Sequence, residues 1–452
     1  MILFLDDKIM KTSPLQFAKK SLNTGANVLS RLHKSASVAG LSALRVAKGE
    51  QMDAYLLKDA FMQMGVTYIK LGQFIASTPS LFPREYVRAF ADCLDATPPV
   101  PFATMREVLA DELAYDGREL DDIFKFIDPV PLASASIAQV HQATLTDGRS
   151  VVLKIQKPNV GAIMQTDLGV LHGAFWMMER ALPMMKIANL APIIDEIRIR
   201  MSAETDFLAE ACHIDKFRKF LDEMGRHHIT APKVHHDLST KRVLVMDLLV
   251  GKSLVDEGLL ASLGQSGHTS PKQVMADVLD TWFLSLMMTG EFHADLHAGN
   301  LMYLDDGRIG FLDFGLMGRI KPSSLQACFS LVQSLQAGDY HGMAQAMVDI
   351  GMTHSDDKIK TEQLADDLNT MMDKVHGSSQ DTDNLNLLML ELVEIGKRYG
   401  VHFPRDFTLL TKQLLYFDRF MVALAPDMEL FEGERLKLVK EQKAPKVLNE
   451  PR

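Results

Sequence analysis

The sequence predicts an α+β fold with two lobes, a smaller strand-rich lobe followed by a larger helical one, behind a helical N-terminal extension. Residues 50–120 carry apolar side chains at helical spacing. Between about 125 and 250, runs of small and β-branched residues bounded by turn signals indicate strands around a helical insert. Helical periodicity dominates from there onward. The expected segments are a basic arm (1–50), a helical extension (51–124), a strand-rich lobe (125–250), a helical lobe (251–440) and a charged tail (441–452).

The composition is that of a globular protein. The 452 residues are 47% hydrophobic and 23% charged, which allows a sizeable core and roughly two to three domains. The net charge of −10 argues against bulk binding to nucleic acid. Cys93, Cys212 and Cys328 lie far apart and form no CxxC pair. They predict free thiols in a reducing compartment, not disulfides or zinc ligands.

The N-terminal arm is strongly basic. From Lys8 to Gly49 there are eight Lys and Arg residues, interleaved with Leu and Val, and no Asp or Glu. This pattern fits an amphipathic arm that contacts an anionic membrane surface, but a solvated helical extension gives the same pattern. No signal peptide and no run of roughly 18 apolar residues is present. We expect a cytoplasmic protein without a transmembrane segment, peripheral at the inner face of a membrane if the arm binds lipid.

Breakers and turn signals delimit the individual elements. Pro79 and Pro83 end a helical pattern, and Asp147-Gly148 is a strong hairpin signal. Asp305-Asp306-Gly307 predicts a second hairpin. The predicted helices are Met52–Ser77, Phe102–Leu113 and stretches within 160–225; the predicted strands are Ile137–Leu145, Arg149–Ile155, a group within Lys233–Leu249, Leu301–Leu304 and Ile309–Leu312.

The strongest functional signal is the pattern His293-Ala294-Asp295-Leu296-His297-Ala298-Gly299-Asn300, followed by a hairpin and Asp313-Phe314-Gly315. Phosphoryl transfer from ATP requires a divalent metal on the phosphates and a carboxylate near the attacking oxygen. Kinases supply these with a catalytic-loop Asp, an Asn five residues later and a DFG Asp beyond a short hairpin. We therefore expect Asp295 to orient or deprotonate the attacking oxygen, and Asn300 and Asp313 to bind Mg²⁺. His293 and His297 are expected to order the loop.

Lys154 ends an apolar strand, where a lysine needs an anionic partner. In a kinase fold this lysine binds the α- and β-phosphates and pairs with a Glu on the following helix. Met246 and Leu248 follow a later strand and would form the hinge whose backbone binds adenine.

No GxGxxG loop precedes Lys154. Small side chains also let a backbone approach phosphates, and hydroxyl groups can donate to them. Alanine cannot adopt the positive φ of glycine, so the loop should be stiffer and its nucleotide selectivity altered. The predicted phosphate-binding residues of this loop are Ala133, Ser134, Ala135 and Ser136.

Several motifs together resemble the UbiB (AarF-like) family of atypical protein-kinase-like ATPases. The loop Ala133–His141 is similar to that family's alanine-rich loop, and His293–Asn300 to its HxDxHxGN segment. Lys70-Leu71-Gly72-Gln73 matches its KxGQ motif, Glu204-Thr205-Asp206 its ExD motif, and Glu210 the Glu that pairs with the strand Lys. The matches run in order from about residue 55 to 320. Leu296 and Ala298 stand where the family commonly has Pro.

The resemblance implies that the helix carrying Lys70, Gly72 and Gln73 covers the active site where a protein substrate would lie. Lys70 would reach the nucleotide pocket, tied to Glu204 and Asp206, because a desolvated lysine needs carboxylate partners.

ATP and Mg²⁺ are the implied cofactors. The expected activity is Mg²⁺-dependent ATP hydrolysis that supports handling of quinone precursors or other isoprenoid lipids, in ubiquinone biosynthesis for example. Two alternatives remain: a kinase that phosphorylates a small molecule or lipid, and a nucleotide-gated pseudokinase that binds ATP without turnover.

Overall fold

In the computed structural model the chain forms two compact units. The first comprises residues 1–207 and 238–244, the second 208–237 and 245–452. These units are spatial groupings, so the predicted segment bounds at 50, 124, 250 and 440 remain predictions. The structure describes 53–77, 84–90, 99–115, 117–181, 204–254, 270–351, 361–377 and 404–425, with short runs or single residues at 31, 33–34, 37–38, 45, 198, 201, 256, 258–259, 263, 391–392, 394–396, 398–401 and 427–428.

The first unit contains most of a five-stranded sheet. Its order is β1-β3-β4-β6, with β2 paired to β3. The β3–β4 hairpin is antiparallel from Ala138↔Gln156 to Thr144↔Ser150, and Gly148 turns it with a φ of +93°. The predicted hairpin is therefore confirmed. The strands are β1 (Phe124–Ile127), β2 (Ala133–Ser134), β3 (Ala138–Leu145), β4 (Ser150–Gln156) and β6 (Val243–Asp247), the last of which continues into the second unit.

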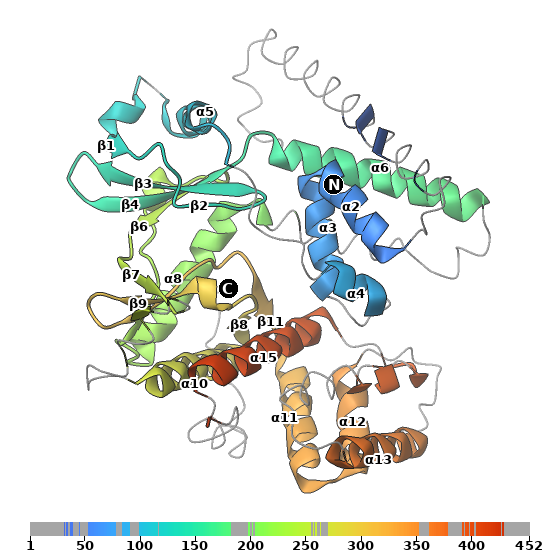
Figure 1. Cartoon of the computed structure of the whole chain (residues 1–452). Coiled ribbons are helices and arrows are strands. Elements are labelled where there is room, and N and C mark those ends of the chain that lie inside the picture. Colours follow the sequence, from blue (N-terminus) through green and yellow to red (C-terminus); the bar gives the residue numbers. More distant parts are fainter. Residues whose placement is uncertain are drawn as a thin grey trace, which may run out of the picture. The chain divides into compact units, whose positions relative to one another are not determined.

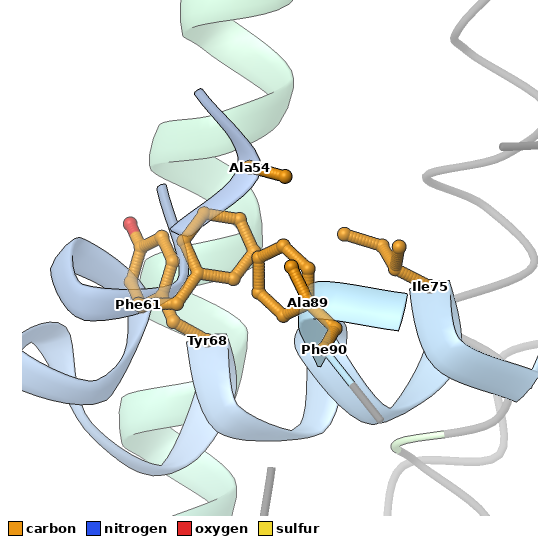
Figure 2. Packing of buried hydrophobic residues seen from close by; sticks show 6 residues of the cluster. All are labelled: Ala54, Phe61, Tyr68, Ile75, Ala89 and Phe90. Carbon is orange, nitrogen blue, oxygen red and sulfur yellow. The ribbon is translucent and has the colours of Figure 1, made fainter. Parts of the chain in front are cut away.

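The helical extension has a small core of its own within the first unit. Helices α2 (Ala54–Met64), α3 (Val66–Ser77) and α4 (Arg84–Phe90) pack on one another, and α3 also packs against α6 (Val160–Ala181) (Figure 1). Figure 2 shows the side chains of Phe61, Tyr68 and Phe90 packed together between these helices. The Phe61 ring centroid lies 5.6 Å from that of Tyr68 and 5.1 Å from that of Phe90. This aromatic core fixes α3, the helix that carries Lys70.

The predicted helix Met52–Ser77 is in fact two helices. Gly65 separates α2 from α3 with a φ of +100°, a conformation that side-chain-bearing residues rarely adopt. Helical spacing continues through the break, so periodicity alone missed it. Helix α5, in contrast, spans Phe102–Leu113 as predicted.

The second unit combines two small sheets with long helices. Its larger sheet has the order β5-β10-β9-β7, and β8 pairs with β11. The predicted hairpin is confirmed as β9 and β10, with Gly307 at a φ of +85°. The strands are β5 (Ile229–Thr230), β7 (Gly251–Ser253), β8 (Glu291–His293), β9 (Leu301–Leu304), β10 (Ile309–Phe311) and β11 (Met317–Arg319). The helices are α8 (Phe207–Glu223), α10 (Pro271–Thr289), α11 (Pro322–Ala337), α12 (Tyr340–Ile350), α13 (Thr361–Gly377) and α15 (Arg405–Leu424).

Two basic residues of the N-terminal arm have carboxylate partners in the first unit. The Arg31 guanidinium makes two hydrogen bonds to Asp167, which is 1% exposed. Arg45 lies 3.3 Å from Asp59. The residues before 31 lie outside the described part of the chain, so membrane contact by the arm stays a prediction. Among the described residues, no helix has the length and apolarity needed to cross a bilayer.

The structure describes two of the three cysteines, and the reducing compartment stays a prediction. Cys212 is an exposed thiol and Cys328 a buried one. Burial raises the pKa of Cys328 to about 12, which keeps it protonated and unreactive. Cys93 lies outside the described residues.

Truncation of the aromatic core should loosen the extension. Phe90 is fully buried, so Phe90→Ala should cost about 3–5 kcal/mol locally. Hydrogen exchange of the peptide 66–77 should then accelerate. Tyr55→Ala, at a residue of α2 that is 61% exposed, is the control and should leave exchange unchanged. Equal exchange in the two variants would mean that α3 does not depend on this core.

Candidate functional site

Lys154 lies on β4, directly opposite Val140 of β3. Its ammonium is 5.5 Å from the centroid of the Phe207 ring, which is buried. A cation–π contact of this kind holds a lysine in a fixed place without neutralising it. Phe207 follows the Glu204-Thr205-Asp206 motif directly, so the motif also brings an aromatic support for the lysine.

The alanine-rich loop is fixed to its own sheet. Ala133 and Ser134 form β2, opposite Val140 and Gln139 of β3. The Ala135 N–H donates to the Ala138 carbonyl, and the Lys157 N–H donates to the Ile137 carbonyl. Ser136 is 4% exposed. These bonds agree with the expected stiffness of the loop; phosphate binding by its residues stays a prediction.

Two polar residues of β3, at the end of this alanine-rich segment, are completely buried. The Gln139 side chain accepts from the Val100 N–H at 2.8 Å and donates to the Val100 carbonyl at 3.1 Å. Its second N–H faces His141 Nε2 at 3.0 Å. Because His141 Nδ1 lies 2.8 Å from the Asp128 carbonyl, it must carry the proton, and Nε2 accepts from Gln139. The network thus binds the segment before α5 to the strand that follows the loop.

Lys70 of α3 forms the ion pair that the resemblance implied. Its ammonium lies 2.9 Å from the Glu204 carboxylate, and both side chains are largely buried. Asp206 lies 3.8 Å from the exposed Lys241. Gly72 and Gln73 lie on the same helix as Lys70. The first unit therefore brings Lys70 and the 204–206 segment together.

The loop from His293 to Asn300, the predicted catalytic loop of the second unit, is ordered by its own side chains. His293 Nε2 donates to the Leu312 carbonyl at 3.1 Å, and its Nδ1 accepts from the Asp295 N–H. The Asn300 amide donates to the Asp295 carbonyl at 2.9 Å. His297 Nδ1 accepts from the Gly299 N–H. Both histidines order the loop, as predicted.

The segment Asp313-Phe314-Gly315 packs against the loop and α8. Phe314 is fully buried, with its ring 5.1 Å from both the His293 and the Phe217 rings. His213 of α8 donates to the Phe314 carbonyl at 3.1 Å. Asp313 has a φ of +51°, a strained conformation for a non-glycine residue that is characteristic of functional sites.

Helix α8 also brings Glu210 to this segment. Glu210, His213 and Phe217 share one face of the helix at positions i, i+3 and i+7. A Cβ built on Gly315 would lie 3.1 Å from Asp313 Oδ1 and 3.9 Å from Glu210 Oε2. The two carboxylates therefore face the same small space. Among the described residues, no group of three or more His, Cys, Asp or Glu forms a metal cluster; a site there would also draw on the Asn300 amide.

The predicted hinge, Met246 to Leu248, begins in β6, and one edge of that strand is hydrogen-bonded to the segment from Lys233 to His235. The Val245 carbonyl accepts from the His235 N–H, and the Asp247 N–H donates to the Lys233 carbonyl. On its other edge, β6 is hydrogen-bonded to β4. The Asp247 carboxylate is itself bonded to the buried His235 at 2.7 Å. Adenine binding by the backbone of Met246 and Leu248 stays a prediction.

Two neighbouring residues of α15 contact the predicted catalytic loop, and the sequence patterns predicted neither contact. The Lys412 ammonium donates to Asp295 Oδ1 at 2.8 Å. The Gln413 amide accepts from the Leu296 N–H at 2.7 Å and donates to the Leu296 carbonyl at 2.9 Å. A signal for Gln413 existed: it is a polar residue on the apolar face formed by Leu410, Phe417 and Met421.

The pKa values of Asp295 and His293 are both lowered, but for different reasons. Burial opposes ionisation of Asp295, but the charge and hydrogen bond of Lys412 outweigh it and lower its pKa. Burial also lowers the pKa of His293, against weaker opposing effects of the Leu312 carbonyl and nearby carboxylates. Asp295 is thus a carboxylate and His293 a neutral imidazole at neutral pH.

The predicted residues fall into two groups. The first unit holds Lys154, the alanine-rich loop, and the Lys70–Glu204 pair. The second unit brings together Asp295, Asn300 and Asp313, with Glu210 beside Asp313. Lys154 and Glu210 belong to different units, so their pairing stays a prediction.

Comparisons with known proteins agree on the kind of protein this is. A sequence model of the ABC1 atypical kinase-like domain matches residues 92–347. An uncharacterised aarF domain-containing protein kinase of Arabidopsis thaliana, described as chloroplastic, is 38% identical over 94% of this chain and 82% of its own length. A probable protein kinase UbiB of Shewanella woodyi is 28% identical over 89% of this chain and 73% of its own.

A solved structure supports the fold. The Mycobacterium tuberculosis protein Rv3197, in complex with erythromycin, superposes with a TM-score of 0.54. The alignment covers 96% of this chain and 98% of that one, at 19% sequence identity. The similarity therefore shows a shared fold and nothing about ligands.

The buried, neutral His293 should make stability depend on pH. Its pKa lies below the ordinary 6.5 in the folded chain, so below about pH 6.5 the unfolded chain takes up a proton that the folded one does not. The contribution of the neutral His293 to the free energy of unfolding is fully present above pH 6.5 and is lost as the pH falls. His293→Gln, which keeps a donor and an acceptor, should flatten the slope between pH 6.5 and 5 by up to about 1.4 kcal/mol per pH unit. Urea unfolding measures it; His341→Gln, at an exposed position, is the control. An unchanged slope in His293→Gln would contradict the assignment.

Proposed function

We propose that this chain, which belongs to the ABC1 (UbiB/AarF) family of atypical kinase-like proteins, binds ATP with Mg²⁺ and hydrolyses it. The observation that carries the proposal is the arrangement of Asp295, Asn300 and Asp313 within the second unit. His293 bonds the segment before Asp295 to that before Asp313, and Asn300 bonds to the Asp295 backbone. Phosphoryl transfer needs these three groups close together.

The residues present fit a magnesium ion. Mg²⁺ prefers oxygen ligands from one or two carboxylates and keeps several waters. Asn300 donates through its nitrogen to Asp295, which leaves its amide oxygen as a ligand. Asp313 supplies a carboxylate in a fixed, strained backbone conformation. When bound, the ion would neutralise charge on the phosphates; Asp295 would orient the attacking oxygen by accepting its proton or its hydrogen bond.

Hydrolysis, rather than phosphorylation of proteins, fits the first unit better. Lys70 is held by Glu204 at 2.9 Å on a helix that has its own aromatic core. A helix fixed in this way suits the role that the resemblance implies, a permanent cover of the active site, and does not suit a loop that opens for a protein substrate. Lys154 and the loop from Ala133 to Ser136 would bind the phosphates, as the resemblance implies.

A role in lipid metabolism is what the resemblance to the UbiB family implies. Shewanella proteins named UbiB are among the relatives of this chain, and we propose a related role in handling quinone precursors or other isoprenoid lipids. Transfer of the γ-phosphate to a small molecule or lipid is the second candidate, because Asp295 retains the position of a catalytic-loop carboxylate. A basic N-terminal arm could bring either activity to an anionic membrane surface.

Removing the proposed metal carboxylate should abolish Mg²⁺-dependent nucleotide binding. Asp313→Asn should weaken ATP affinity in Mg²⁺ by more than about tenfold, since even indirect partners of a metal typically cost 10–100-fold. Affinity in EDTA should stay unchanged. Calorimetry measures both, with Asp306→Asn in the exposed hairpin turn as the matched control. Equal Mg²⁺-dependent affinity in Asp313→Asn and wild type would rule out Asp313 as a ligand.

The fate of the γ-phosphate tests the reaction. We expect purified protein to release labelled phosphate from γ-labelled ATP, and to do so faster with anionic liposomes that contain an isoprenoid lipid. Asp295→Asn should bind ATP normally and lose about 100-fold or more of the rate. Label on a lipid or small molecule would support the kinase instead. ATP binding with no turnover in wild type would indicate a pseudokinase.

A further inference from the structure

Helix α15 contributes two side chains to the catalytic loop from far away in the sequence. Lys412 and Gln413 lie 117 residues beyond Asp295 and Leu296, the residues that they contact. Both lie outside the residues 92–347 that the ABC1 domain model matches. The contacts are therefore not part of any motif in the catalytic segment itself.

Gln413 fixes the backbone of the loop. Leu296 is fully buried, and its N–H and carbonyl are both bonded to the Gln413 amide at 2.7 and 2.9 Å. Gln413 is also fully buried. Removal of a buried partner leaves polar groups without hydrogen bonds, which is costly. The peptide after Asp295 is thus fixed by a side chain and not by regular secondary structure.

Lys412 fixes the carboxylate next to that backbone. Its ammonium donates to Asp295 Oδ1 at 2.8 Å and lies 5.2 Å from the centroid of the Tyr416 ring, one turn further along α15. A lysine side chain has many rotamers, so contacts on two sides limit where its charge lies. Only one oxygen of Asp295 is bonded to Lys412, which leaves the other to the attacking group.

Aromatic packing fixes the position of α15 next to the loop. Phe417, one turn from Gln413, packs edge-on against Trp282 of α10 at 5.0 Å. The Trp282 indole in turn donates to the His293 carbonyl at 2.8 Å. Trp282 therefore contacts both α15 and the loop, and a shift of either would break several contacts at once.

We propose that Lys412 and Gln413 are positioning residues of the catalytic loop: Lys412 orients the Asp295 carboxylate and Gln413 anchors the peptide that follows it. The kinetic part of this proposal rests on the ATP hydrolysis proposed above. Neither residue need touch the nucleotide. Their loss should therefore change the rate of the chemical step and leave nucleotide binding intact.

Four variants of the full chain test the proposal. Lys412→Met keeps the aliphatic stem without the charge, Lys412→Arg keeps the charge, and Gln413→Leu keeps the volume of the amide without its hydrogen bonds. Lys216→Met is the matched control, because it removes another ion pair of the second unit, 3.5 Å from Glu291. The readouts are kcat and KM for Mg²⁺-ATP and hydrogen exchange of the catalytic-loop peptide.

Lys412→Met should lower kcat by about 10–100-fold with KM within about threefold, since small misplacements of a reacting group have effects of this size. Lys412→Arg should recover most of the rate. Gln413→Leu should lower kcat and speed exchange of the Leu296 amide by more than about tenfold, as a freed amide exchanges by local opening. Lys216→Met should match wild type.

Three results would overturn the proposal. Wild-type or higher kcat in Lys412→Met would mean that the ion pair does not orient Asp295 for the reaction. A parallel loss of rate and nucleotide affinity, without rescue by Arg, would reduce Lys412 to a structural role. Unchanged exchange at Leu296 in Gln413→Leu would exclude the anchor. If wild type releases no phosphate, the proposed function fails. Hydrogen exchange of the loop peptide then still tests the positioning role, because this exchange should be faster in Lys412→Met and in Gln413→Leu than in wild type.

Discussion

The buried imidazole of His293 joins the two acidic segments of the second unit. One ring nitrogen donates to the carbonyl before Asp313, and the other accepts from the amide of Asp295. Both bonds require the neutral ring, which burial favours. The Phe314 ring packs against the same imidazole. The backbones on which Asp295 and Asp313 lie therefore have a fixed relation, because one uncharged side chain bonds to both.

In each unit, a buried glutamine side chain hydrogen-bonds to both backbone polar groups of a residue in an irregular segment. Gln139 makes two hydrogen bonds to the Val100 backbone, and Gln413 makes two to the Leu296 backbone. Both are fully buried. Irregular segments cannot satisfy their polar groups within a helix or sheet, and a buried amide offers a donor and an acceptor together. The irregular segments around Val100 and Leu296 are fixed in this way where secondary structure ends.

Local patterns predicted what depends on neighbours in the sequence. The spacing of Asp295, Asn300 and Asp313 predicted their association, and the turn signals predicted both hairpins. The pairing of Lys70 with Glu204 came from a resemblance and has a direct geometric counterpart. Lys412 was missed because a single lysine on an amphipathic helix carries no sign of a partner 117 residues away. The break at Gly65 was missed because helical spacing is the same on both of its sides.

The network around Gln139 has a consequence for how substitutions act in this chain. Its carbonyl oxygen and both amide hydrogens are used, and the facing groups are an N–H, a carbonyl and a bare ring nitrogen. Glutamate differs from glutamine by a single group, yet it would place an acceptor against two acceptors. At this position even the most conservative replacement therefore removes the hydrogen bond to the Val100 carbonyl.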